Sequence, residues 1–296
     1  GGQSKWQNFK DFLNLFYTDE LQDVEITAPA YDAATTTDEE GFFILTVPTG
    51  QGAPTSIAVR ANGSDNDHEV LIHTSQDAAF GVISDIDDTV IRTGIAEPLK
   101  HWRTIIESDA EARVAFPGLA PLYQALERGG EREPRNPIFY VSSGSWKLYD
   151  LIARFKVLNG IPLGPVFMDD WGLDETRWFK SSHGAHKKAA ITRIMETYPS
   201  LDFILVGDSG QHDAEIYAEM VRKHGARIKA VWIRDVSGDA RDAEVQTLLR
   251  EAAEAGVAVF MEPDLLEAAI DAAARGWIGP EDLSVVRAAI AEAVPV

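Results

Sequence analysis

The pattern of apolar and polar positions changes character near residue 80. Before it, short β-type runs are separated by turn-rich stretches, an arrangement typical of a small β-sandwich. These runs are Asp23–Thr27, Phe42–Val47, Ser56–Ala61 and Glu69–Thr74. An opening helix is predicted by one apolar stripe, which comprises Trp6, Phe9, Leu13 and Phe16. We therefore expect residues 1–79 to form an opening helix and a small β-sandwich domain.

From Phe80 onward, apolar runs alternate with segments of helical periodicity. The runs that we predict as strands are Gly81–Ser84, Ile138–Ser142, Pro165–Met168, Phe203–Gly207, Ile228–Ile233 and Val257–Phe260. The predicted helices are Leu119–Arg128, Trp146–Leu158, Lys187–Thr197, Asp213–His224 and the stretches 241–255, 263–275 and 280–293. This alternation predicts an α/β domain over residues 80–296, with a Rossmann-like parallel sheet between layers of helices. Ligands of such sheets bind beyond the carboxyl ends of the strands.

Charge and composition narrow the functions that fit the chain. Its 296 residues carry a formal net charge of −20, which opposes nonspecific binding to nucleic acid or to strongly anionic membranes. Cysteine is absent, so disulfides and thiolate chemistry are excluded. No apolar run reaches the roughly 18–20 residues of a transmembrane helix, and Gly1–Phe16 lacks the apolar core of a signal peptide. We expect a cytoplasmic protein with no transmembrane segment, at most peripheral at membranes.

Chemically active side chains follow several of the predicted strands. Asp85-Ile-Asp-Asp-Thr89 ends the first strand, Ser142-Ser-Gly144 ends the second, and Gly207-Asp-Ser-Gly-Gln-His-Asp213 follows the strand at Phe203. The sequence His186-Lys-Lys188 opens the intervening helix. Taken alone, each has a structural explanation, because Asp and Ser are common in turns and helix caps and most lysines are solvated. His183 and His186 are also weak candidates for a metal pair, and we favour surface or supporting roles for them.

Together these residues form the set that phosphoryl transfer requires. One carboxylate can act as nucleophile and form an aspartyl-phosphate, while a second protonates the leaving alcohol and then activates water. Crowded carboxylates repel one another unless a hard cation lies among them, and Mg²⁺ prefers oxygen ligands. A lysine and a serine can meet the charge on the phosphoryl oxygens.

The same motifs resemble, in order, the four motifs of the haloacid dehalogenase-like phosphatases. The match is closer still to the catalytic domain of the actin-patch phosphatidate phosphatases and their bacterial relatives, over roughly residues 78–236. It rests on three segments: Gly81–Thr89, Phe139–Trp146 and Gly207–Tyr217. The resemblance implies a haloacid dehalogenase-like fold and a magnesium-dependent phosphomonoesterase. Its substrate would be phosphatidate or another bulky phosphate, met at a membrane surface in the case of a lipid.

Residue roles follow from this resemblance by position. Asp85 matches the nucleophile, Asp87 the acid/base and Thr89 the residue that holds Asp87. The resemblance also implies phosphate-binding residues, namely Ser142, Ser143 and Lys187, with Lys188 and Lys180 as competitors for the lysine role. The implied Mg²⁺ ligands are Asp85, Asp87, Asp208 and, in a supporting position, Asp213.

Two features bear on substrate choice. The chain has Ser145 where the family pattern leads us to expect proline, so the loop before Trp146 is expected to be freer. The insertions after the first two motifs are too short for a separate cap domain of about 50 residues, which predicts a minimal cap and an open site. Lys100, Trp102 and Arg103 in the first insertion are candidates for substrate contact, although Trp102 can equally pack the insertion onto the core.

Three alternatives remain open from sequence. One is a phosphatase for phosphoproteins or small metabolites. Another is a receiver-type signalling domain, which also gathers acidic residues, a hydroxyl and a lysine, although the spacing of Thr89 and the Gly207–Asp213 segment argue against it. The third is a binding protein whose acidic site no longer turns over. Sequence does not determine the oligomeric state.

Overall fold

A computed structural model describes residues 21–39, 41–48, 54–73, 77–86, 89–90, 115–131, 135–169, 183–210, 212–236 and 242–293. These residues divide into two compact units, one within residues 21–73 and one within residues 77–293. The predicted opening helix lies outside the described residues. None of the described helices has the length and apolar character that a membrane crossing requires.

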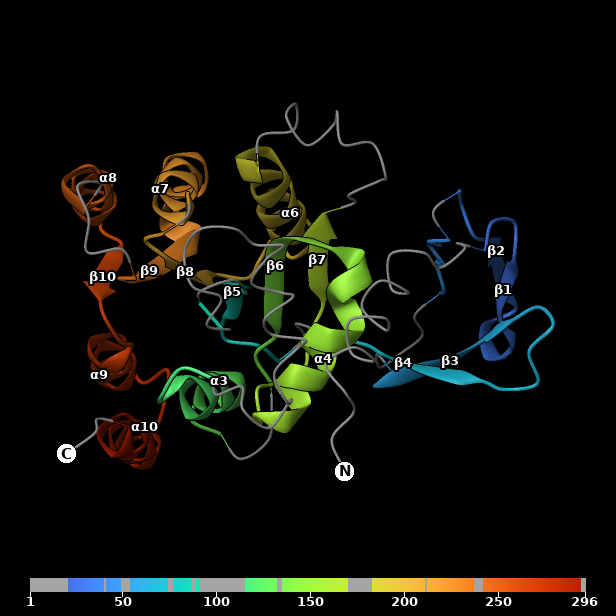
Figure 1. The fold of residues 1–296 in the computed structure, drawn as a ribbon, viewed down its shortest axis with the longest axis horizontal. Helices are drawn as coiled ribbons and strands as arrows, with labels where there is room; N and C mark the ends of the chain where they lie inside the picture. Colours follow the sequence, from blue (N-terminus) through green and yellow to red (C-terminus); the bar gives the residue numbers. More distant parts are fainter. Residues whose placement is uncertain are drawn as a thin grey trace, which may run out of the picture. The chain divides into compact units, whose positions relative to one another are not determined.

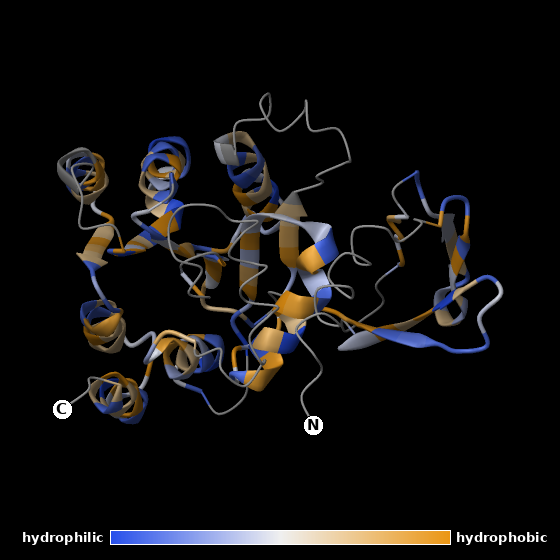
Figure 2. Ribbon diagram, in the orientation of Figure 1, coloured by the Kyte–Doolittle hydropathy of each residue, from blue (hydrophilic) through white to orange (hydrophobic). Residues whose placement is uncertain are grey.

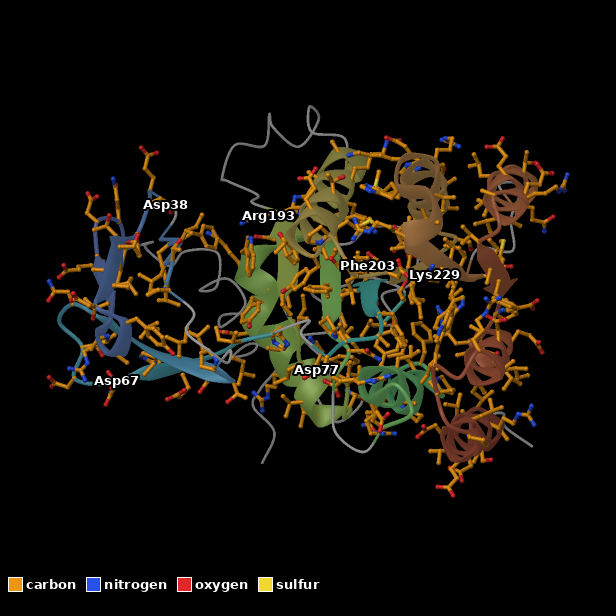
Figure 3. The ribbon with its side chains drawn as sticks, turned by 180° about the vertical axis from the view of Figure 1, so that it is seen from behind. Asp38, Asp67, Asp77, Arg193, Phe203 and Lys229 are labelled. Atoms are coloured by element: carbon orange, nitrogen blue, oxygen red, sulfur yellow. The ribbon has the colours of Figure 1, made fainter. Side chains whose placement is uncertain are left out.

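The first unit contains one four-stranded antiparallel sheet. Its strands are β1 (Glu25–Ala28), β2 (Ala33–Thr36), β3 (Ser56–Ala61) and β4 (His68–Leu71), in the order β2-β1-β3-β4. Among residues 21–73, apart from the gaps in their description, there is no second sheet of the kind that a sandwich contains. The predicted run Phe42–Val47 is not a strand, whereas the strand β2 was not predicted. Carboxylates around Asp38 and Asp67 project from this unit (Figure 3).

The second unit is built on a six-stranded, wholly parallel sheet. Its strands are β5 (Gly81–Asp85), β6 (Ile138–Ser145), β7 (Val166–Asp169), β8 (Phe203–Asp208), β9 (Ile228–Arg234) and β10 (Ala258–Glu262). Their order is β10-β9-β8-β5-β6-β7. This is the doubly wound order, in which the chain leaves β5 toward one edge and returns at β8 toward the other. The predicted parallel α/β sheet is therefore confirmed.

Helices cover both faces of this sheet (Figure 1). One face carries α6 (His183–Thr197), α7 (Asp213–His224) and α8 (Asp242–Glu254). The other carries α3 (Leu119–Arg128), α4 (Tyr149–Leu158), α9 (Leu266–Ala274) and α10 (Pro280–Glu292). The strands are apolar along most of their length, whereas the helices alternate between apolar and polar residues, as expected of a sheet buried between two layers (Figure 2).

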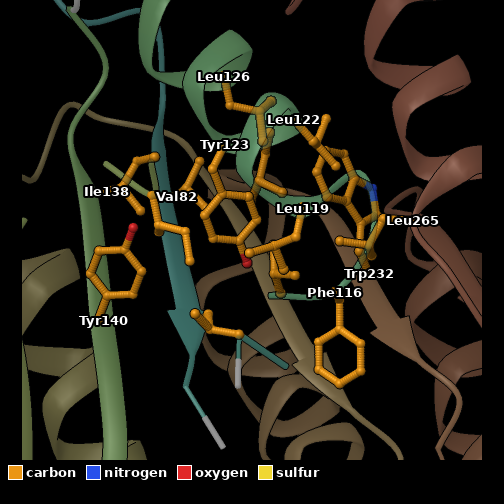
Figure 4. Packing of buried hydrophobic residues seen from close by; sticks show 14 of the residues in the cluster. Val82, Phe116, Leu119, Leu122, Tyr123, Leu126, Ile138, Tyr140, Trp232 and Leu265 are labelled. Carbon is orange, nitrogen blue, oxygen red and sulfur yellow. The ribbon is translucent and has the colours of Figure 1, made fainter. Parts of the chain in front are cut away.

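The two faces of the sheet form two cores. Side chains alternate along each strand, so Val82 packs on the α3 face while Ile83 packs on the α6 face. The α3 face is filled by large side chains that include Tyr123 and Trp232 (Figure 4). Burying a valine, leucine, isoleucine or phenylalanine side chain in these cores stabilises the fold by about 1.5–3 kcal/mol. These cores hold the strand ends, and hence the motifs that follow them, in fixed positions.

Candidate active site

The candidate site lies where the doubly wound sheet reverses direction. Strands β5 and β8 are neighbours there, and each ends in an aspartate, Asp85 and Asp208. Sheets of this order bind ligands in the crevice beyond such a point, because the connections leave the two strands in opposite directions. Both side chains are buried, at 1% and 0% exposure.

Lys187 joins the site from the α6 face. Its Nζ atom lies 2.6 Å from Oδ1 of Asp85 and 2.6 Å from Oδ1 of Asp213, and all three side chains are buried. Burial alone lowers the pKa of Lys187, but the carboxylates of Asp213, Asp85 and Asp208 outweigh it and raise that pKa above its usual value. Lys187 is therefore a fixed positive charge between two carboxylates.

Asp213 begins α7 and reaches back to the end of β8. Its Oδ2 atom accepts a hydrogen bond of 3.2 Å from the backbone N–H of Asp208. This approach depends on Gly207, since a Cβ atom there would lie 2.6 Å from Oδ2 of Asp213 and 2.9 Å from the ring of Tyr217. The Gly-Asp pair at the end of β8 thus has a steric reason to contain glycine.

Asp85, Asp208 and Asp213 form a buried acidic cluster. One ligand oxygen from each lies within 4.8 Å of those of the other two. Three buried carboxylates repel one another even with Lys187 between them, and a divalent cation relieves that repulsion. The donor set is entirely carboxylate oxygen, which fits a hard cation such as Mg²⁺ or Ca²⁺ and not a thiolate-bound metal.

The predicted hydroxyl residues occupy neighbouring positions. Val141 is the register partner of Asp85, so Ser142 and Ser143 follow directly at the same end of β6. Ser142 is buried, and its Oγ atom accepts a 2.9 Å hydrogen bond from the N–H of Gly144. The Oγ atoms of Ser143 and Thr89 are buried, and neither has a hydrogen-bond partner within the described ranges. Buried hydroxyls in this state are donors that a bound anion or a neighbouring carboxylate can satisfy.

Lys188 and Lys187 differ clearly in position. Lys188 is partly exposed and pairs with Glu219 of α7, whereas Lys187 points into the acidic cluster.

Trp146 packs against Tyr149, with 5.8 Å between ring centroids, and Ser145 accepts a hydrogen bond from the N–H of Lys147 at the start of the following turn. Other predicted residues lie outside the described part, namely Asp87, Lys100, Trp102, Arg103, Lys180 and the side chain of His183.

Sequence reasoning passed over one buried charge at this end of the sheet. Arg234 ends β9, is the register partner of Asp208, and is only 7% exposed. A charged residue directly after the apolar run at Val231–Ile233 was the available signal, because it occupies the same strand-end position as Asp85 and Asp208.

Comparison with known proteins agrees with this arrangement. A model of the family described as "Phosphatidate phosphatase APP1, catalytic domain" matches residues 80–235, more than half of the chain. The chain belongs to this family. The predicted membership in the actin-patch phosphatidate phosphatase family is thereby confirmed, and the matched segment begins before β5 and ends after β9.

Two relatives match the chain over only part of their own length. The phosphatidate phosphatase APP1 of Saccharomyces cerevisiae is 30% identical over 164 residues, which make up 55% of this chain and 27% of the yeast protein. An uncharacterized protein of Schizosaccharomyces pombe is 23% identical over 239 residues, 77% of this chain and 38% of that protein. The chain thus spans well under half the length of each relative. No solved structure matches it significantly.

Proposed function

We propose that residues 80–296 are a haloacid dehalogenase-like phosphatase domain that hydrolyses phosphate monoesters through an aspartyl-phosphate. The observation that carries the proposal is the contact of Lys187 with both Asp85 and Asp213 beside Asp208, at the reversal point of a doubly wound sheet. The family match supports the same activity.

In this mechanism Asp85 is the nucleophile. A carboxylate oxygen of Asp85 forms a bond to phosphorus as the bond from phosphorus to the substrate alcohol breaks. Asp87 protonates the departing alcohol oxygen, and Thr89 holds Asp87 in position. Asp87 then takes a proton from water, whose oxygen attacks phosphorus, releasing inorganic phosphate and restoring the carboxylate of Asp85. Both steps balance without any oxidant or other co-reactant.

The remaining residues bind and neutralise charge. Lys187 offsets negative charge at Asp85 and on the phosphoryl group, while Ser142 and Ser143 donate hydrogen bonds to phosphoryl oxygens. Asp85, Asp208 and Asp87 would hold Mg²⁺, with Asp213 supporting Asp208 and Lys187. When bound, Mg²⁺ would neutralise charge on the phosphate group and on the acidic cluster.

The substrate that we propose is a lipid phosphate, phosphatidate in particular. The support is the family match and the name of the yeast relative, together with the shortness of the two insertions, which leaves the site open to a bulky substrate. The net charge of −20 disfavours strongly anionic surfaces, so we expect action on weakly charged ones.

The test is a phosphate-release assay with phosphatidate in mixed micelles, with glycerol phosphate, a sugar phosphate and a phosphopeptide for comparison. Magnesium is present in one series and chelated in the other. We expect magnesium-dependent hydrolysis, with the highest kcat/KM for phosphatidate. A clear preference for a small phosphate would exclude the lipid substrate but not the phosphatase activity, and hydrolysis that is indifferent to chelation would exclude the metal.

A further inference from the structure

Arg234 is an unusual side chain to bury. Within the described ranges, the charged side chains in the buried class are Asp85, Asp208, Asp213, Lys187, Arg234 and Lys156. Burying an arginine costs several kcal/mol unless opposite charge or a ligand compensates for it. All of these residues except Lys156 lie at or near the carboxyl end of the sheet, so Arg234 is part of one group of charges.

The side chain of Arg234 is held at this end from the α3 face. Its guanidinium carbon lies 3.0 Å from the ring centroid of Phe116. Phe116 lies on the α3 face at the end toward which the β5 arrow points (Figure 4). Stacking on an aromatic ring fixes the guanidinium plane and leaves its N–H groups at the edge of that plane.

A second observation is that Arg234 acts electrostatically on a residue beside Asp85, the proposed nucleophile. The hydroxyl of Tyr123 hydrogen-bonds with Ser84 Oγ at 2.7 Å, directly before Asp85. Burial raises the pKa of Tyr123, the charge of Asp85 raises it further, and the charge of Arg234 lowers it. The phenol of Tyr123 is therefore close enough to Asp85, at the end of β5, and to Arg234, at the end of β9, for both charges to affect its pKa.

Lys187 and Arg234 approach the site from opposite faces of the sheet. Lys187 belongs to α6, whereas Arg234 packs with Phe116 of the α3 face. Among the buried described residues at this end, three carboxylates face two cations. A phosphate monoester is largely a dianion near neutral pH, so a second cation reduces the repulsion that the acidic cluster would exert on it.

We propose that Arg234 is a substrate-binding residue that recognises the dianionic phosphate group of the substrate through its fixed positive charge, on the face opposite Lys187. The proposal rests on the proposed function. In this role Arg234 binds phosphate and takes no part in the bond-breaking step. Replacing Arg234 should therefore raise KM more than it lowers kcat.

The test compares Arg234→Met, which removes the charge but can still pack on Phe116, with Arg234→Lys, which keeps the charge. Arg227→Met is the matched control. Arg227 donates hydrogen bonds to the carbonyls of Met195, Tyr198 and Leu201, and its guanidinium lies 5.8 Å from the ring of Phe203. It precedes β9, whereas Arg234 ends it. Loss of Arg227 is therefore a purely structural defect.

Two quantities are measured with magnesium present: the Kd for inorganic phosphate by calorimetry and the kinetics of phosphatidate hydrolysis. We expect Arg234→Met to raise Kd and KM at least about tenfold, with a smaller change in kcat, the order expected for losing one charged contact. Arg234→Lys should stay within about threefold of wild type for both constants, and Arg227→Met should lower the Tm without raising Kd.

The possible results bear separately on the role of Arg234 and on the proposed phosphatase function. Unchanged Kd and KM in folded Arg234→Met overturn the proposal. If that variant does not fold, Arg234→Lys decides, because a tenfold loss of phosphate affinity with the charge retained also overturns it. A wild-type protein that binds phosphate through Arg234 but hydrolyses no ester would contradict only the proposed function. A wild-type protein that binds no phosphate would contradict both.

Discussion

The Nζ atom of Lys187 lies 2.6 Å from Oδ1 of Asp213, across 26 positions of sequence. Lys187 lies in the second turn of α6 and Asp213 begins α7, and the two helices are neighbours on the same face of the sheet. Because Asp213 also accepts a hydrogen bond from the backbone of Asp208, Lys187 is linked through it to the end of β8. The position of the lysine is thus determined by the ends of β5 and β8 and by the start of α7.

Replacing the central lysine tests its role directly. Lys187→Met should lower kcat/KM by at least about a hundredfold, because it removes the cation between Asp85 and Asp213 and leaves their charges unopposed. The control is Lys188→Met, since Lys188 pairs with Glu219 away from the acidic cluster. Equal losses in the two variants would contradict the assignment of Lys187.

The steric requirement at Gly207 gives a second prediction. Gly207→Ala should lower the free energy of unfolding by about 1–3 kcal/mol and also reduce activity, because its Cβ atom would displace Asp213. Gly184→Ala is the control, as the nearest atom to its added Cβ is 3.8 Å away on Ile216, and alanine favours a helix by up to about 1 kcal/mol. Urea unfolding measures the change in stability, and phosphate release measures the change in activity. If the Gly207→Ala variant were as stable and as active as the Gly184→Ala variant, the close contact of Gly207 with Asp213 would not be required.

The buried Lys156 should make the free energy of unfolding depend on pH. It is buried in α4 with Nζ 3.4 Å from the ring centroid of Tyr140, and burial lowers its pKa to about 7, although Glu127 opposes the shift. Between about pH 7 and the ordinary lysine pKa near 10.4, the folded state binds fewer protons than the unfolded state. The free energy of unfolding contributed by Lys156 therefore increases with pH in that window, by up to about 1.4 kcal/mol per pH unit.

Urea unfolding between pH 6 and pH 9, on the wild type and on Lys156→Met, measures this slope. The substitution should remove most of the increase and should stabilise the protein at the acidic end, where the wild type buries a cation. Lys229→Met, at an exposed pair with Asp202, should leave the slope in place. A slope that is the same in all three proteins would show that Lys156 keeps an ordinary pKa.

Much of the second unit was predictable because apolar periodicity alone determines its elements. The helices α3 and α7 have the predicted bounds, and strands β5, β6, β8 and β9 extend the predicted runs by one to three residues. Each extension adds polar residues such as Asp85 or Ser143, which the pattern assigned to loops but which lie within strands in the structure, and Asp85 pairs with Val141 of β6. Polar residues at a strand end keep the backbone ladder while their side chains leave the core.

The first unit was less predictable for the opposite reason. Strand β2 has the sequence Ala-Ala-Thr-Thr, with no large apolar residue, and is a strand because it pairs with β1. Phe42–Val47 is apolar but is not in a strand, and Ile44 is 76% exposed. In short edge strands, pairing and turns outweigh hydrophobic periodicity.

At the site, sequence order identified the acidic motifs, but the contacts depended on tertiary structure. Nothing in the spacing distinguishes Lys187 from Lys188, because only the direction of the helix face decides which one reaches Asp85. Arg234 was missed since no single motif contains it. Its place beside Asp208 follows from strand order, which the sequence alone did not provide.

The nucleophile is tested by Asp85→Asn, which retains the shape of the side chain but cannot form an acyl phosphate. We expect less than about one per cent of wild-type turnover with an unchanged fold by circular dichroism. Asp77→Asn, an exposed position ahead of β5, is the matched control and should keep full activity. Substantial turnover by Asp85→Asn would remove Asp85 from its proposed role.

The most direct test of a covalent phosphatase is to trap the intermediate. The wild type is mixed with radiolabelled phosphatidate in mixed micelles with magnesium, quenched in acid within the first turnover and analysed for label on the protein. We predict label at Asp85 that is acid-stable, lost on treatment with hydroxylamine, and absent when magnesium is chelated or when Asp85 is asparagine. Rapid hydrolysis of phosphatidate with no label on the wild type at any quench time, or with the same label on Asp85→Asn, would contradict the account.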